Sequence, residues 1–215
     1  MRFAQRTAIL ITAAITGLAP MATATAAAVS APSVQGTARA ATGCITVTAT
    51  IAVSTEPFGV AANPKTNTVY VVNNNDGGPG SVSVISGRTN TVVATIPVGG
   101  NSAGVAANPK TNTTYVTSDG ADNTVSVING RTNTVTATIP VGAVPFGVAA
   151  NPKTNTIYVT NTQVNTVSVI SGRTNTVTAT IPVGSLPAGV AANPKTNTTY
   201  VATDTVLSVL APCPR

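Results

Sequence analysis

Apolar and polar residues alternate in short runs along most of the chain. The clearest run, Thr176–Val183, has the sequence TVTATIPV, in which apolar and polar side chains follow each other with a period of two. Shorter apolar-rich runs precede it, over 146–150, 156–160 and 166–170. This period, together with the many Val and Thr residues, is typical of half-buried β-strands. The segment therefore predicts a unit of four strands.

The segments between these runs predict tight turns. Residues 151–155 have the sequence NPKTN, and residues 171–175 have the sequence SGRTN. Proline presets φ for a type I turn, and Asn and Gly favour the turn conformations that follow. The first strand of the unit is rich in Gly and Ala, which suits a crowded inner position. The fourth carries Pro182, which cannot donate a ladder hydrogen bond and so favours an outer edge.

The whole unit recurs along the chain. The phrase NPKTN begins at Asn63, Asn108, Asn151 and Asn193, so the period is about 42 to 45 residues. A period of this length with four strands per unit predicts the blades of an all-β β-propeller. The last unit lacks its fourth strand, and Thr46–Val53, TVTATIAV, repeats that strand's sequence. We therefore expect four four-stranded blades, with the N-terminal strand completing the last blade and closing the ring.

One phrase indicates a family. Tyr158–Asn161 is YVTN, set in NPKTNTIYVTN and followed by VSVISGRTNTVTATIPVG. This resembles the YVTN-repeat β-propeller family, and the resemblance covers roughly residues 45 to 210. It implies a secreted or surface-layer-like propeller, in a family that includes members with no assigned activity.

The N-terminus predicts export. A basic start, MRFAQR, is followed by a short apolar run and then by small residues, which is the order of a secretory signal peptide. We expect a signal peptide over 1–28, a flexible lead-in over 29–43 and a propeller domain over 44–215. Apart from the signal, no transmembrane segment is expected, and the predicted location is extracellular or at the cell surface.

The two cysteines align with one turn of the repeat. Cys213 falls at the position of Arg173 and Cys44 at that of Thr174, so both belong to the one third-to-fourth-strand turn that the chain does not span. An even number of cysteines in a secreted chain favours disulfide bonding. We therefore expect an intrachain Cys44–Cys213 disulfide.

The composition excludes several chemistries. The chain has no histidine, which removes Ser-His-Asp triads and His-ligated zinc sites. No catalytic residue, metal or cofactor is predicted. A lyase or hydrolase would have to use a pair of loop carboxylates.

The charges are expected to separate onto two faces. In an up-and-down blade, the first-to-second and third-to-fourth turns lie on one face, which we call the turn face, and the remaining connections lie on the other, the loop face. The turn face is predicted to carry Lys65, Lys110, Lys153, Lys195, Arg88, Arg131 and Arg173. The loop face is predicted to carry Glu56, Asp76, Asp119, Asp122 and Asp204.

The loop face also varies most between units. Its second-to-third-strand loops are NNNDGGPG, SDGADN, NTQVN and TDT, whereas the turns of the other face are near copies. Loops that diverge on a fixed scaffold often carry specificity, although unselected drift gives the same pattern. Phe58 and Phe146 begin first strands at the inner rim of this face, where burial between blades is one expectation and ligand contact the other.

These features lead to one leading function and two alternatives. The leading one is a non-enzymatic binding or surface-display module that uses the loop face for an extracellular glycan, wall polymer or protein. The alternatives are carboxylate catalysis on the loop face and polyanion binding on the turn face. Nucleic acid is not an expected partner, because aromatic side chains for base stacking are absent from the turn face. A monomer is expected, with an eight-bladed ring of two chains as the alternative.

Overall fold

The computed structural model describes residues 46–75, 78–121 and 123–212, and its strands all lie in one compact unit, 47–215. Among these residues no helix is long and apolar enough to cross a membrane. The described strands are β1 (Pro57–Asn63), β2 (Thr68–Asn73), β3 (Ser81–Ser86), β4 (Thr91–Pro97), β5 (Ser102–Asn108), β6 (Thr113–Ser118), β7 (Thr124–Asn129), β8 (Thr134–Pro140), β9 (Pro145–Asn151), β10 (Thr156–Asn161), β11 (Thr166–Ser171), β12 (Thr176–Pro182), β13 (Val190–Asn193), β14 (Thr198–Ala202) and β15 (Leu207–Leu210).

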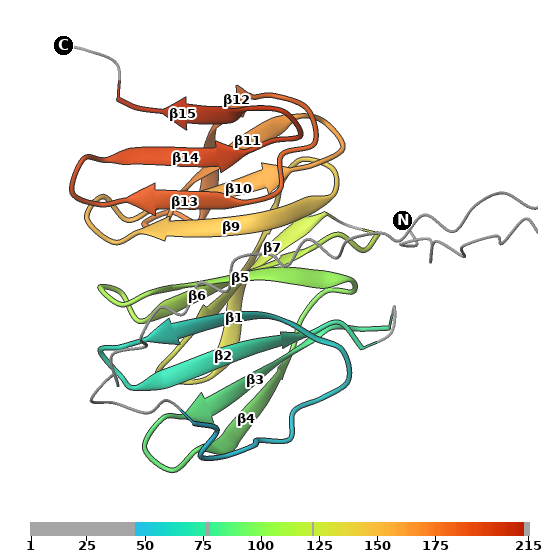
Figure 1. Cartoon of the computed structure of the whole chain (residues 1–215), viewed down its shortest axis with the longest axis vertical. Helices are drawn as coiled ribbons and strands as arrows, with labels where there is room; N and C mark the ends of the chain where they lie inside the picture. Colours follow the sequence, from blue (N-terminus) through green and yellow to red (C-terminus); the bar gives the residue numbers. More distant parts are fainter. Residues whose placement is uncertain (1–45, 76–77, 122, 213–215) are drawn as a thin grey trace, which may run out of the picture. The chain divides into compact units, whose positions relative to one another are not determined.

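The strands form four antiparallel sheets in chain order, which we call blades 1 to 4. Blades 1, 2 and 3 have four strands each, β1–β4, β5–β8 and β9–β12, and blade 4 has three, β13–β15. The first strands β1, β5, β9 and β13 lie side by side, each against the next (Figure 1). The all-β class and the division into blades are therefore confirmed, with strand ends within two residues of those expected in the third unit.

The segment 46–53 differs from the expectation. It forms no strand, is mostly exposed, and leaves β15 as the outer strand of a three-stranded sheet. The segment leads into β1 of blade 1, whereas β15 belongs to blade 4, whose first strand β13 shares no extensive contact with β1. Closure of the ring by this segment therefore stays a prediction.

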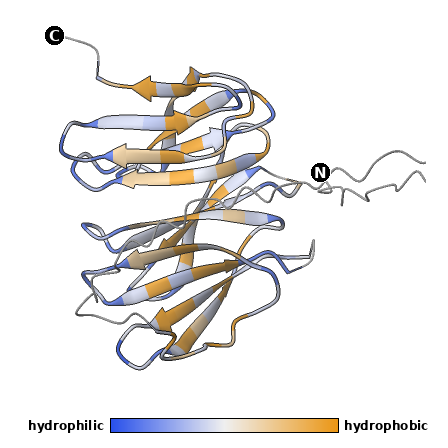
Figure 2. Cartoon of the chain, viewed as in Figure 1, coloured by the Kyte–Doolittle hydropathy of each residue, from blue (hydrophilic) through white to orange (hydrophobic). Residues whose placement is uncertain are grey.

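The core lies between blades rather than within one sheet. Figure 2 shows apolar positions along the strands and hydrophilic ones at the connecting turns. Between blades 1 and 2, Tyr70, Val82 and Val84 of blade 1 pack with Val116 and Ile128 of blade 2. The equivalent side chains, led by Tyr115, form a second cluster between blades 2 and 3. A blade therefore buries each of its two faces only by having a neighbour on that side.

Glycines in the first strands allow the blades to approach closely. A Cβ at Gly59, Gly104 or Gly147 would clash with a backbone carbonyl of the next blade, which belongs to Ala103, Phe146 or Ala188 respectively. Because a carbonyl cannot rotate away as a flexible side chain can, these positions require glycine. The contact recurs at all three junctions between blades.

Buried asparagines connect the same junctions. The Nδ2 of Asn63 donates to Asn112 Oδ1 at 2.8 Å, and the Asn108–Asn155 and Asn151–Asn197 pairs repeat this bond at 2.8 Å. The three donors are at most 1% exposed. Each donor opens an NPKTN turn, and each acceptor closes the NPKTN turn of the following blade.

The glycine contact predicts the effect of a single methyl group. We expect Gly147→Ala to lower the free energy of unfolding by about 1–3 kcal/mol, because the added Cβ forces blades 3 and 4 apart in a packed junction. Chemical denaturation of the purified variant measures this change. Unaltered stability would contradict the close approach of Gly147 to the Ala188 carbonyl.

Burial also gives the core a pH dependence. Burial raises the pKa of Tyr115 to about 12 from its usual 10.0, so the folded state holds the phenolic proton more tightly than the unfolded chain. This contribution to stability is complete below pH 10 and is lost as the pH rises towards 12. We expect the free energy of unfolding to fall across that range, and to fall less in Tyr115→Phe. Equal slopes in the two proteins would contradict the assignment.

Candidate functional site

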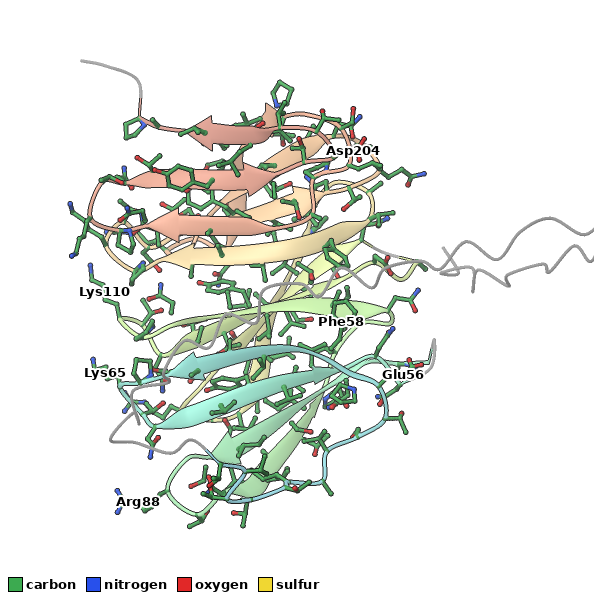
Figure 3. The ribbon with its side chains drawn as sticks, viewed as in Figure 1. Glu56, Phe58, Lys65, Arg88, Lys110 and Asp204 are labelled. Carbon is green, nitrogen blue, oxygen red and sulfur yellow. The ribbon has the colours of Figure 1, made fainter. Side chains whose placement is uncertain are left out.

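The described basic side chains lie on the turn face. All seven of them are exposed in turns that join first to second or third to fourth strands. Figure 3 shows Lys65, Lys110 and Arg88 at one end of the strands. The Nζ of Lys110 also approaches the carbonyl of Lys153 at 3.4 Å, so the lysine turns of blades 2 and 3 are adjacent.

The described acids lie at the opposite end. Glu56 and Asp204 stand across the molecule from the labelled lysines (Figure 3). Asp119 follows β6 in the loop to β7, also on the loop face. Asp76 and Asp122 lie outside the described residues, as do Cys44 and Cys213. Among the residues that the structure describes, basic and acidic side chains thus lie at opposite ends of the strands.

The loop face has an ordered backbone despite its varied sequence. In each blade, a backbone N–H just after the second strand donates to a carbonyl in the loop that precedes the first strand. The four bonds are Asn74 N to Glu56 O at 3.0 Å, Asp119 N to Asn101 O at 3.3 Å, Thr162 N to Val144 O at 2.9 Å and Asp204 N to Ser185 O at 2.8 Å. The rim therefore has one repeated framework that carries different side chains.

Asparagine side chains extend this framework between blades. Asn123 Oδ1 accepts from Val144 N at 2.8 Å, and Asn165 Oδ1 accepts from Leu186 N at 2.9 Å. Val144 and Leu186 both have positive φ, 55° and 50°, a conformation that is costly for such side chains. The asparagine bonds offset part of that cost and fix how these apolar side chains are presented.

A pocket opens among the first strands. It has a volume of about 270 Å³, and residues of β1, β5 and β9, with residues at the start of blade 4, line it. Phe58 and Phe146 meet there edge to face, with ring centroids 5.8 Å apart. Phe58 is 62% exposed, so the expectation of burial between blades is wrong for this ring. Since Phe58 lies just after Glu56, the aromatic pair belongs to the loop face (Figure 3).

The chemistry of the described acids is limited. One carboxylate oxygen of Asp119 is buried and makes no hydrogen bond to the described residues. Asp119 and Asp204 belong to blades 2 and 4. No group of three or more His, Cys, Asp or Glu residues suited to a metal ion occurs in the described part of the chain. The pocket with its phenylalanine pair, which residues of all four blades line, is therefore the candidate ligand site of this face.

Sequence reasoning missed three parts of this arrangement. It placed Phe58 and Phe146 on the inner rim but did not bring the two rings together across the intervening blade. It also missed the interblade asparagine pairs and the close approach of the first-strand glycines. The signal for the last two was present, because GVAANPKTN is repeated without change in every unit.

The similarity to solved structures supports the fold. The chain superposes on hydrazine synthase of Kuenenia stuttgartiensis with a TM-score of 0.67 and 23% identity, over 79% of this chain and 49% of that one. It also superposes on a functionally unknown protein from Desulfotomaculum acetoxidans DSM 771, with a TM-score of 0.63 and 19% identity, over 71% and 50% of the two chains. This chain thus spans about half the length of each. No protein-family model and no curated protein sequence matches it.

Proposed function

We propose that this protein is a secreted member of the YVTN-repeat propellers that binds an extracellular glycan on its loop face, without catalysis. The observation that carries the proposal is the exposed Phe58–Phe146 pair at the mouth of the pocket between the first strands. The repeated sequence and the four blades support the assignment to this kind of propeller. The predicted signal peptide supports its location outside the cell.

The chemistry of the loop face suits a sugar. A phenylalanine ring offers an apolar surface to the C–H groups of a pyranose, while neighbouring amide, hydroxyl and carboxylate groups bind its hydroxyls. Polar groups of this kind surround the rim, with Asn and Thr in the second-to-third-strand loops. Recognition by a shallow apolar surface and a few placed polar groups is a common arrangement in ligand sites.

The turn face suits a different and less selective role. Its lysines and arginines are exposed, their turns are near-identical from blade to blade, and the turn sequences contain no aromatic residue. Such a surface attracts polyanions over long range, and salt screens that attraction. Polyanion binding on the turn face is therefore the second candidate function. Glycan binding should depend on residues of the loop face, whereas polyanion binding should depend on the lysines and arginines of the turn face.

Substituting the aromatic pair tests the proposal. We expect Phe58→Ala combined with Phe146→Ala to abolish binding of purified cell-wall polysaccharides and arrayed glycans, because the stacking surface is removed. Glycan arrays and isothermal titration calorimetry measure the binding, while circular dichroism and solution mass verify that fold and assembly are intact.

A turn-face variant is the matched control. Changing Lys65, Lys110, Lys153 and Lys195 to Ser should leave glycan binding intact at physiological salt. Loss of binding in the lysine variant, with retention in the phenylalanine variant, would overturn the proposal and favour the polyanion alternative. Turnover of a bound glycan that disappears in Asp119→Ser would instead favour the carboxylate enzyme.

A further inference from the structure

The two ends of the blade series expose surfaces that are buried everywhere else. In blade 4, Tyr200 pairs in register with Val209, as Tyr70 pairs with Val84 and Tyr115 with Val127 in blades 1 and 2. Tyr70 and Tyr115 are fully buried, whereas Tyr200 is 37% exposed and Val209 is 57% exposed. This apolar surface, formed by Tyr200, Leu207 and Val209, is the last end face.

Blade 1 exposes part of the opposite half of the same contact, although Ile85, the counterpart of Ile128, is buried. Val60 of β1 is 68% exposed, although its counterpart Val105 in blade 2 packs against the core between blades 1 and 2. Val60 and Ala62, which is also exposed, form the first end face. The last end face corresponds to the surface with which blades 1, 2 and 3 each pack against the following blade. The first end face corresponds to the surface with which blades 2, 3 and 4 each pack against the preceding blade.

The specific contacts between blades are also left unmade at the ends. Three glycines press against a carbonyl of the next blade, but a Cβ at Gly189 would meet only the Cβ of Ala202, at 3.7 Å. Three asparagines donate to the next blade at 2.8 Å. The equivalent donor in blade 4 is Asn193, and the equivalent acceptor in blade 1 is Asn67. Among the described residues, Asn193 therefore has no following blade to donate to, and Asn67 has no preceding blade to accept from.

We propose that two copies of this chain join head to tail, last end face to first end face, into an eight-bladed ring. The surfaces are complementary because each is a copy of a surface that already binds the other three times within the chain. A head-to-tail contact either closes into a ring or continues as a filament. Propellers typically close with four to eight blades, so chains of four blades can form a ring as one copy or as two.

The two-copy ring fits this structure better than closure of one chain. Among the described residues, β1 and β13 share no extensive contact, and Val60 and Val209 stay exposed. In the ring, Gly189 would face the Phe58 carbonyl of a second copy, and Asn193 would face its Asn67. The segment 46–53 would lie beside β15 of the neighbouring copy, because each fourth strand leads directly into the first strand of the next blade. The predicted Cys44–Cys213 disulfide would then join two chains.

Solution mass of the full chain tests the proposal. We expect light scattering after size exclusion to give twice the mass of the chain, with and without reductant. Val209→Asp, on the last end face, and Val60→Asp, on the first, should each weaken association at least about tenfold, because each places an unpaired charge in an apolar interface. Val164→Asp is the matched control, since Val164 is an exposed valine of a blade 3 loop away from both end faces; it should remain a dimer.

Mixing the two variants distinguishes a head-to-tail contact from a face-to-face one. A Val209→Asp chain and a Val60→Asp chain still form one interface between two unaltered faces, so association should return in the mixture. Gly189→Ala supplies a second probe: it should weaken the dimer while leaving the unfolding of dilute, monomeric protein unchanged. Val60 and Gly189 line the pocket of the phenylalanine pair, whereas Val209 does not. A failure of Val209→Asp to weaken association would therefore contradict the ring and leave the glycan proposal standing.

Three results would overturn the two-copy ring. The first is a monomeric mass for the unaltered protein in all conditions, with the disulfide inside one chain on nonreducing gels, which would indicate a four-bladed ring. The second is a mass that grows continuously with concentration, which would indicate an open filament. The third is dimerisation that Val209→Asp abolishes and Val60→Asp leaves unchanged, which would indicate a symmetric contact between last end faces.

Discussion

The buried asparagine that opens the NPKTN turn in blades 1, 2 and 3 is the contact on which the arrangement of blades depends. Its Oδ1 accepts from the backbone N–H two residues later, as in Asn63 to Lys65 at 3.1 Å, and its Nδ2 donates to the next blade. Burying an amide without partners is costly, so the residue is stable there only when its own turn and the neighbouring blade are both in place. One side chain thus couples the shape of the turn to the stacking of the blades. This coupling accounts for a phrase repeated almost letter for letter, since a change in one copy would affect two blades.

The same coupling leaves the loop face free to vary. Its loops are held by backbone bonds, such as Thr162 N to Val144 O, and these bonds place no demand on the side chains. Divergent loops can therefore sit on a rim of constant geometry, while the turn face, whose side chains make the structural contacts, stays uniform. In this protein the uniform turns and the variable loops therefore lie at opposite ends of the strands. An aromatic pair at the loop end of the first strands is then a local addition that the fold does not require.

Most of the fold was predictable from the chain because its signals are local. Period-two alternation, Pro182 at an outer strand and the NPKTN turns placed the strands of the third unit within two residues, and the sorting of charge by face followed from antiparallel connectivity alone. The contact between Phe58 and Phe146 was not predictable, because it depends on the curvature of the blade series, which no short pattern encodes. Closure of the ring stays a prediction for a related reason. The match of Thr46–Val53 to a fourth strand identifies what the segment resembles, but leaves open whose sheet it joins.

Internal repetition makes the end faces complementary without any further selection. Every repeat array has to deal with its terminal units, either by polar capping repeats or by closing on itself. In the part of the chain that the structure describes, Leu207 and Val209 are exposed at one end and Val60 at the other, and such apolar surfaces in isolation would favour aggregation. The register of an assembly is nevertheless well defined, because the asparagine pair and the glycine-to-carbonyl contact each allow one alignment of adjacent blades. A two-copy ring would present two loop faces side by side on one surface. Even weak glycan binding at each would then be strengthened on a repetitive polymer, since the second site engages at high effective concentration once the first is occupied.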